Sequence, residues 1–124
     1  MGNTHTDFSE YEAIARTVQL YVDGATSGRG ADMQRAFHQE ATIFGYADGE
    51  LVAGPIQLLL DSVDQDAPAT GLHARIAGID IVDTIAGVRL ELDDWNGHRY
   101  TDLFTLLKVD GAWKIMNKVF HQHP

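Results

Sequence analysis

The sequence has no cysteine and few basic residues. Without cysteine there is no disulfide framework, no thiolate nucleophile and no cysteine-based zinc site. Nine Lys and Arg stand against eighteen Asp and Glu, which gives a net charge of −9. This excess of negative charge repels phosphate backbones and anionic lipid, so we expect neither a nucleic-acid partner nor a membrane-surface partner.

Long apolar runs are also absent. No stretch approaches the length of a membrane span, and residues 1–10 lack the basic and apolar regions of a signal peptide. Hydrophobic residues nevertheless make up 44% of the 124 residues, which is enough for a buried core without staples. We therefore expect a cytoplasmic protein that forms a single domain over residues 1–124, with residues 1–8 flexible.

Two kinds of periodicity divide the chain. Apolar residues recur every three or four positions between Tyr11 and Ala25, which predicts a long helix. Asp32 is a candidate cap for a short second helix that runs through Glu40. The pair Gly54-Pro55 begins a third helix, because proline at the first helical position loses no hydrogen bond.

Strands and tight turns account for most of the remainder. Asp48-Gly49, Asn96-Gly97 and Asp110-Gly111 supply the positive φ angles that two-residue hairpin turns need. They separate strands expected at 41–46, 51–53, 72–83, 88–95, 99–109 and 113–121. The predicted order is ααββαββββ, with helices grouped early and long antiparallel strands late, and it indicates an α+β fold.

The strand expected at 99–109 is apolar on both faces. Leu103 and Leu107 lie on one face, while Phe104 and Leu106 lie on the other. A strand of this kind is covered on both sides, and three helices cover only one face of such a sheet. We expect a homodimer in which the outer face of the sheet is the interface.

The pattern of elements resembles the NTF2-like superfamily, and most of all its SnoaL-like and “putative lumazine-binding” branch. The resemblance rests on the helix pair, the strand Ala41-Thr42-Ile43-Phe44, the Gly54-Pro55 helix start and the closing segment DGAWKIMNKVFH. It implies a cone, in which a curved antiparallel sheet wraps the long N-terminal helix, with two further helices, and leaves an internal pocket. The superfamily includes isomerases, dehydratases, cyclases and non-catalytic binders, so the fold alone assigns no function.

Ketosteroid isomerases of this superfamily provide a specific test. Their pocket uses a tyrosine on the first helix, an aspartate on the first strand and an aspartic acid on a later strand. Aligned with that pattern, this chain carries Thr17, Gly45 and Thr105 at the three places. None of these residues does the acid or base work, so the resemblance implies no steroid isomerase.

Lys118, Asp102 and His73 are the catalytic candidates. The resemblance places Lys118 and Phe120 inside the cone, where a buried lysine needs a carboxylate or an anionic ligand. The alternative register turns Lys118 to water or to the dimer surface. Asp102 interrupts an apolar stretch, either as a general base or as the ion-pair partner of Lys118 or Arg75.

Further candidates surround the expected pocket. His73 and Arg75 share one strand face, where they either hold a carboxylate or enolate oxygen or answer surface carboxylates. His38 near the end of the second helix either borders the pocket or favours the helix dipole. The aromatic candidates for pocket lining are Tyr21, Tyr46, Tyr100 and Phe104, although aromatic residues also build ordinary cores.

No cofactor or metal is expected. His121 and His123 have a spacing that suits a metal, but no HExxH-type motif accompanies them and a polar tail accounts for them equally. Three functions of different kinds remain. They are a binder of a small, partly apolar organic molecule, a lyase or isomerase acting on a carbonyl compound, and a non-catalytic dimeric association module.

Overall fold

The computed structural model describes residues 8–124. The elements are α1 (Phe8–Ser27), α2 (Gly30–Gln34), β1 (Phe37–Ala47), β2 (Glu50–Pro55), α3 (Gln57–Gln65), β3 (His73–Val82), β4 (Ile85–Trp95), β5 (His98–Val109) and β6 (Ala112–Gln122). This order confirms the predicted ααββαββββ sequence of elements. The flexible segment expected over residues 1–8 lies, apart from Phe8, outside the described residues.

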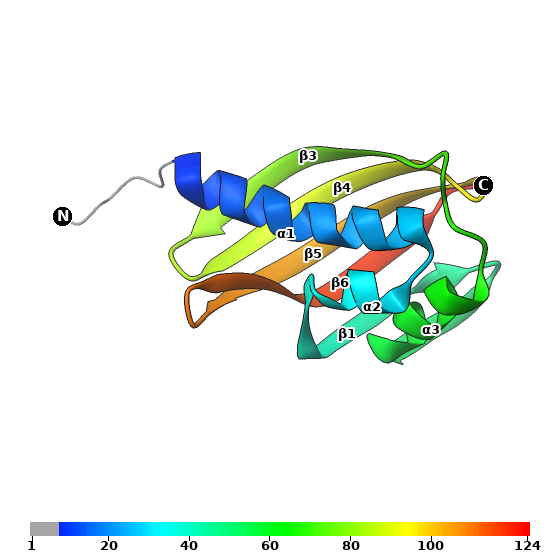
Figure 1. Ribbon diagram of the computed structural model, residues 1–124, viewed down its shortest axis with the longest axis horizontal. Coiled ribbons are helices and arrows are strands. Elements are labelled where there is room, and N and C mark those ends of the chain that lie inside the picture. The colour runs from blue at the N-terminus through cyan, green and yellow to red at the C-terminus, as the bar shows by residue number, and fades with distance from the viewer. Residues whose placement is uncertain (1–7) are drawn as a thin grey trace.

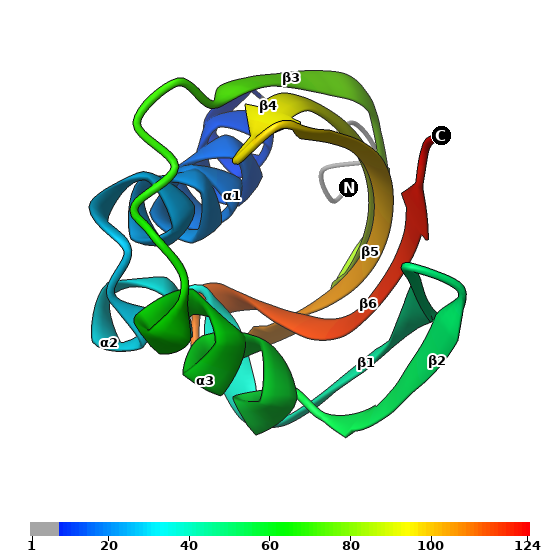
Figure 2. The same ribbon diagram turned by 90° about the vertical axis from the view of Figure 1, so that its right-hand side faces the viewer.

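The six strands form one sheet in the order β2-β1-β6-β5-β4-β3. It curves around α1, while α2 and α3 lie together near one end of its concave side (Figures 1 and 2). The α+β cone predicted from the sequence is confirmed. One pairing differs from the expected antiparallel sheet, because β1 and β6 run parallel.

The three predicted hairpin turns are present. Asp48, Asn96 and Asp110 have φ angles of 51°, 51° and 50°, and the glycine that follows each of them is also at positive φ. These turns fix the antiparallel pairs β1·β2, β4·β5 and β5·β6. The sequence therefore determines the register of three of the five strand pairs through local backbone geometry.

The core lies between α1 and the concave face of the sheet. Ile14, Val18, Tyr21 and Ala25 recur at helical spacing along α1 and are all buried. Inward-facing residues of β4, β5 and β6 cover them, among them Leu90, Phe104 and Ile115. Gly24 lets α2 approach α1 closely, since a side chain at this position would collide with Met33.

The second helix is shorter than predicted. It ends at Gln34 instead of continuing through Glu40, and β1 begins at Phe37. The backbone of Ala36 already accepts a hydrogen bond from the amide of Ile115, so pairing with β6 replaces the next helical turn. His38 consequently belongs to a strand, and its expected place near a helix end is wrong.

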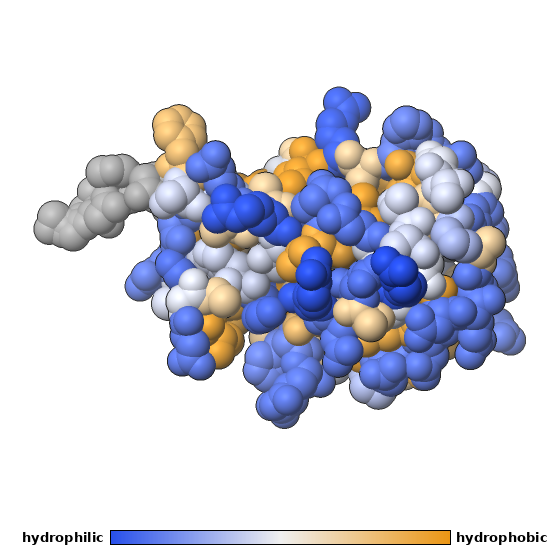
Figure 3. All heavy atoms as spheres, in the orientation of Figure 1, coloured by the Kyte–Doolittle hydropathy of each residue, from blue (hydrophilic) through white to orange (hydrophobic). Residues whose placement is uncertain are grey.

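The outer face of the sheet carries an apolar row. Phe44, Val119 and Leu103 are neighbours across β1, β6 and β5, and each is exposed. On the face that carries α1, apolar residues are instead interspersed among hydrophilic ones (Figure 3). None of the helices between residues 8 and 124 combines the length and apolar character needed to cross a bilayer.

Candidate functional site

A cavity of about 760 Å³ lies at the end of the sheet where β4 turns into β5. Its walls are apolar and aromatic and come from β1, β2, α3, β4 and β6: Ile43, Val52, Leu59, Trp95 and Phe120. Its rim is polar and includes Asp48, Asp66, Asn96, His98 and Gln122. A concave apolar chamber with a few polar groups is the usual form of a small-molecule site.

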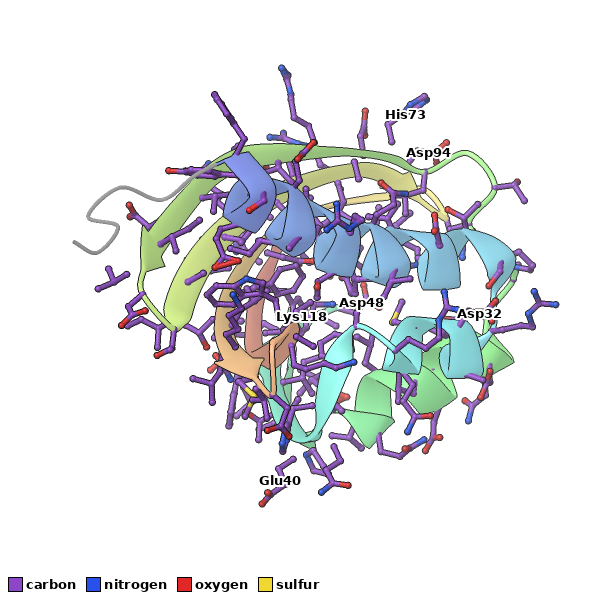
Figure 4. The ribbon with its side chains drawn as sticks, turned by 60° about the vertical axis from the view of Figure 1, so that its left-hand side comes forward. Asp32, Glu40, Asp48, His73, Asp94 and Lys118 are labelled. Carbon is purple, nitrogen blue, oxygen red and sulfur yellow. The ribbon has the colours of Figure 1, made fainter. Side chains whose placement is uncertain are left out.

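Lys118 is the charged side chain in the wall of this cavity. It is 4% exposed, and it points from β6 into the interior between α1 and the sheet (Figure 4). Its Nζ lies 5.1, 5.3 and 5.1 Å from the ring centroids of Tyr21, Trp95 and Phe120. Within residues 8–124, Nζ makes neither a hydrogen bond nor an ion pair with a protein group.

Two β-bulges turn the cavity side chains inward. On β6, Trp113 and Ile115 are buried, but Met116 is an extra residue opposite the Thr105/Leu106 junction, so the next inward side chain is Lys118. On β4 the register shifts between Leu92 and Trp95, which turns the Trp95 ring towards the cavity. A bulge re-aims the side chains that follow it, and both bulges here serve one site.

Asp102 lies behind this wall and is fully buried on β5. The hydroxyl of Tyr21, from α1, donates a hydrogen bond of 2.7 Å to Asp102 Oδ2. Asp102 Oδ1 has no hydrogen-bond partner among the described residues. Asp102 thus has a hydrogen bond to only one of its two oxygens, although burial normally requires both to be satisfied.

Burial shifts the pKa values of these three groups. It lowers the pKa of Lys118, and the negative charge of Asp102 offsets part of that shift. It raises the pKa of Asp102, against the influence of Lys118 and of the Tyr21 hydrogen bond. The pKa of Tyr21 is also raised, first by burial and then by Asp102. Burial therefore favours a neutral amine on Lys118 and a neutral acid on Asp102.

The rim of the cavity is a connected polar network centred on Gln122. Its Oε1 accepts a hydrogen bond of 2.7 Å from the Asp48 amide. Its Nε2 donates to the Tyr100 hydroxyl at 3.2 Å and lies 3.3 Å from His98 Nδ1. This arrangement joins the β1–β2 turn to β5 and β6 beside the opening, and the Tyr100 ring packs against the wall residues Trp95 and Phe120.

Only some of the predicted pocket residues line the cavity. Lys118, Tyr100 and Phe120 line the cavity. Tyr21 and Phe104 are buried one layer behind it, where their rings pack edge to face with centroids 5.1 Å apart. Of the predicted catalytic residues Lys118, Asp102 and His73, only Lys118 lines the cavity, and Asp102 lies behind it.

Besides Tyr21 and Phe104, four further predicted pocket residues do not line the cavity. His73 and Arg75 are exposed on β3, and His73 points away from the interior (Figure 4). Tyr46 is 63% exposed because it shares the outer face of β1 with Phe44. His38 lies at the start of β1, where its Nδ1 accepts a hydrogen bond from the Glu40 amide. Placing these four side chains in the pocket was wrong.

Several residues of the cavity wall were not among the predicted pocket residues. Ile43, Val52 and Leu59 come from segments that look like ordinary core, and only the tertiary fold brings them together. Trp95 could have been found as an aromatic beside a hairpin turn, but the alternation of β4 places it outward without the bulge. His98, the first residue of β5, is exposed at the rim of the cavity.

The ketosteroid-isomerase alignment needs one correction. Thr105 is exposed on the outer face of β5, so the inward acidic position on this strand is held by Asp102. On α1, Thr17 donates a hydrogen bond to the Trp113 carbonyl, and Tyr21, one turn later, reaches the site. Gly45 does face inward on β1, and it offers no carboxylate there.

The remaining histidines form no metal cluster. The rings of His121 and His123 stack edge to face with centroids 4.7 Å apart, and His123 Nε2 lies 2.9 Å from Thr101 Oγ1. Residues 8–124 hold no group of three or more His, Asp or Glu side chains arranged for a metal ion.

Comparison with known proteins places the whole chain in one group. The family model described as “Putative lumazine-binding” matches residues 9–121. Aldolase FrzH from Cladobotryum sp is 34% identical over 121 residues, which is 97% of both chains. An NTF2-like protein of unknown function from Methylobacillus flagellatus is 42% identical, with a TM-score of 0.93 over 96% of both chains. Another, from Shewanella baltica, is 42% identical, with a TM-score of 0.90 over 97% of this chain and 99% of its own.

Proposed function

Because the chain belongs to the “putative lumazine-binding” family of NTF2-like proteins, we propose that its cavity binds a small, partly apolar organic molecule through a carbonyl or carboxylate oxygen. The observation that carries this proposal is the Lys118 amine. It sits in an aromatic wall, faces the chamber and has no protein acceptor within residues 8–124. A buried amine is costly unless paired, and a ligand oxygen is the partner that the site lacks.

The shape and chemistry of the cavity define the ligand further. The aromatic walls favour a flat apolar body, while Lys118 offers N–H donors at one place only. Solvent reaches the rim, where Asp48 and Asp66 are exposed. The ligand accordingly has an apolar body, an oxygen directed at Lys118 and any polar substituents at the opening.

Three probes of one shape test this proposal: naphthalene, a methyl naphthyl ketone and a naphthoate. Binding to wild type and to Lys118→Met is measured by titration calorimetry. We expect Lys118→Met to weaken the ketone and the naphthoate by about tenfold, since a hydrogen bond to a charged or buried group is worth roughly 1.5 kcal/mol or more. Naphthalene should bind both proteins equally.

Lys114→Met is the matched control. Lys114 lies on the same strand, but its Nζ donates to the Arg35 carbonyl away from the cavity. The control should bind all three probes like wild type. Equal weakening of all three probes by Lys118→Met would contradict the proposal, because the lysine would then contribute only wall surface.

A second candidate function is catalytic: formation or cleavage of a carbon–carbon bond beside a carbonyl group. It is supported by the name of the 34% identical relative, an aldolase, and by Tyr21 and Asp102 behind the Lys118 amine. The test is the cleavage of a β-hydroxyketone that releases a fluorescent naphthaldehyde. Release should exceed the solution rate in wild type and Lys114→Met, and fall to that rate in Lys118→Met. Equal release by all three proteins would eliminate this candidate.

We also propose that the protein forms a homodimer through the outer face of the sheet. The exposed row Phe44, Val119 and Leu103 supports this interface, because apolar residues contiguous across three strands favour a partner. Native mass spectrometry of wild type and Val119→Asp should give a dimer and a monomer, respectively. The cytoplasmic location expected from the sequence stays a prediction.

A further inference from the structure

The geometry points to Lys118 as a covalent nucleophile: we infer that its Nζ forms a Schiff base with the carbonyl carbon of a ketone or aldehyde held in the cavity. This inference rests on the proposed function and deepens it. It selects carbonyl compounds over carboxylates as ligands and gives the lysine a bond-forming role instead of a purely electrostatic one.

The three lysines of the chain differ in what their amines contact. Lys108 Nζ bridges both oxygens of Glu10 at 2.9 Å, and Lys114 Nζ donates to the Arg35 carbonyl at 2.9 Å. Lys118 alone of the three has no such acceptor within residues 8–124, and it alone lines the cavity. Lys118 is therefore the lysine that lines space a ligand can occupy and has no competing protein acceptor within residues 8–124.

Burial favours the form of the Lys118 amine in which the nitrogen lone pair carries no proton. It lowers the pKa of Lys118, and Asp102 on β5 offsets the shift only in part. Tyr21 on α1 packs against Nζ from behind the cavity, and its hydroxyl donates a hydrogen bond to Asp102. Towards the cavity, the other titratable groups are Tyr100 and His98 on β5, with Asp48 and Asp66 at the rim. A nucleophilic lysine needs an environment of this kind, in which desolvation disfavours the ammonium form.

The bond-forming step balances without an added co-reactant. The Nζ lone pair attacks the carbonyl carbon, a C–N bond forms, and the carbonyl π electrons move to oxygen. The oxygen takes one proton from the amine and one from solvent at the open rim, and then leaves as water. The product is an iminium ion that carries one positive charge and one N–H bond.

The three aromatic rings around Nζ interact more favourably with the positively charged iminium product than with the neutral amine. The rings of Tyr21, Trp95 and Phe120, with centroids 5.1 to 5.3 Å from Nζ, lie within the range at which a ring face attracts a cation. Asp102 adds negative charge behind the same nitrogen whenever it is ionised. The site therefore favours a neutral amine before the reaction and stabilises a cation after it.

The test uses the wild-type chain, so it does not depend on a variant that folds. The protein is treated at neutral pH with acetone and sodium cyanoborohydride, which converts an imine into a stable isopropylamine. Peptide mapping by mass spectrometry then gives the rate at each lysine. We expect Lys118 to react at least about tenfold faster than Lys108 and Lys114, the difference that one unit of pKa gives. A rate at Lys118 equal to or below theirs would overturn the inference.

A second probe needs no reductant. Acetylacetone, a β-diketone, forms a conjugated enaminone with a nucleophilic lysine, and the adduct absorbs in the near ultraviolet. One adduct per chain should form in wild type and in Lys114→Arg, and none in Lys118→Arg, which keeps the positive charge but not the nucleophile. An undiminished adduct in a folded Lys118→Arg protein would assign the reaction to another amine and overturn the inference.

The two proposals fail in different ways. If the naphthyl ketone binds but neither acetone nor acetylacetone labels Lys118, the cavity binds ligands and the covalent step is wrong. If acetylacetone labels Lys118 but no naphthyl probe binds, the amine is reactive and the description of the ligand is wrong. If nothing binds and nothing labels, both proposals fail.

Discussion

The two ends of the interior are built from opposite kinds of side chain. At the end where β5 turns into β6, Ile14, Leu106 and Ile115 fill the space between α1 and the sheet and are buried. At the other end, aromatic rings surround a lysine, and a carboxyl oxygen of Asp102 lacks a partner. The same helix and the same three strands form both ends.

The two ends therefore contribute differently to stability and to ligand binding. Aliphatic packing at the closed end lowers the free energy of the fold, and no ionisable group of residues 8–124 is buried among Ile14, Leu106 and Ile115. The lysine end buries ionisable groups, which oppose folding unless they are paired. Substitutions that reduce stability at the first end should therefore leave ligand binding intact, whereas replacing the lysine at the second end should weaken ligand binding without reducing stability.

The largest expected effect is at the closed end. Ile115→Ala removes a fully buried side chain, and we expect it to lower the free energy of unfolding by about 2–5 kcal/mol. Urea denaturation followed by circular dichroism measures this change. Labelling of Lys118 by acetylacetone should be unaffected at low urea, and loss of labelling in the folded variant would show that the two ends are not independent.

A smaller effect is expected from Tyr21→Phe. The change removes the hydrogen bond to Asp102 Oδ2 and leaves both oxygens of a buried carboxyl group without a donor, which should cost about 1–3 kcal/mol. Tyr100→Phe is the matched control, because its hydroxyl accepts from Gln122 in a half-buried position at the cavity rim. Equal losses of unfolding free energy in the two variants would mean that the Tyr21–Asp102 hydrogen bond stabilises the fold no more than the hydrogen bond at the rim.

The smallest effect, and one of opposite sign, is expected from Lys118→Met. The folded pKa of Lys118 lies below its ordinary value, so between the two values the unfolded chain binds more protons and wild-type stability rises with pH. Methionine lacks this dependence. The variant should be more stable than wild type near pH 7, by about 1 kcal/mol or more, and the gap should narrow as pH approaches the ordinary lysine pKa.

Urea denaturation of wild type and Lys118→Met at a series of pH values measures the difference in their free energies of unfolding. The control is Lys114→Met. Its difference in stability from wild type should not change with pH in this way, since Lys114 is not enclosed. A loss of several kcal/mol in Lys118→Met at neutral pH would show instead that a charged Lys118 holds Asp102 in place.

The fold was predictable because its determinants are local. Helical spacing along α1 and the pairs Asp48-Gly49, Asn96-Gly97 and Asp110-Gly111 fix elements and register within a few residues of sequence. The early end of α2 was not predictable in the same way. It depends on the hydrogen bond from Ile115 to Ala36, which joins distant parts of the chain.

The site was less predictable because two bulges break the alternation on which strand arguments depend. Counting by twos from the buried Trp113 and Ile115 places Lys118 outside, whereas Met116 as an extra residue places it inside. The same count from Leu92 turns Trp95 outward. Composition gives no sign of either bulge, so the sequence alone left the direction of Lys118 open.

The position of β6 has a consequence for how the chain folds. β6 follows every other strand in sequence, yet it lies between β1 and β5, and its pairing of Thr42 with Asn117 joins distant segments. The β1·β2 hairpin and the β3–β6 meander form from near neighbours, whereas uniting them must wait for the pairing of β1 with β6, the step with the greatest loss of chain entropy. Since β6 also carries Lys118, the amine is enclosed in the same event that completes the sheet. A chain in which the sheet is incomplete therefore exposes an ordinary lysine, and the reactivity of Lys118 towards a carbonyl probe would time the completion of the sheet.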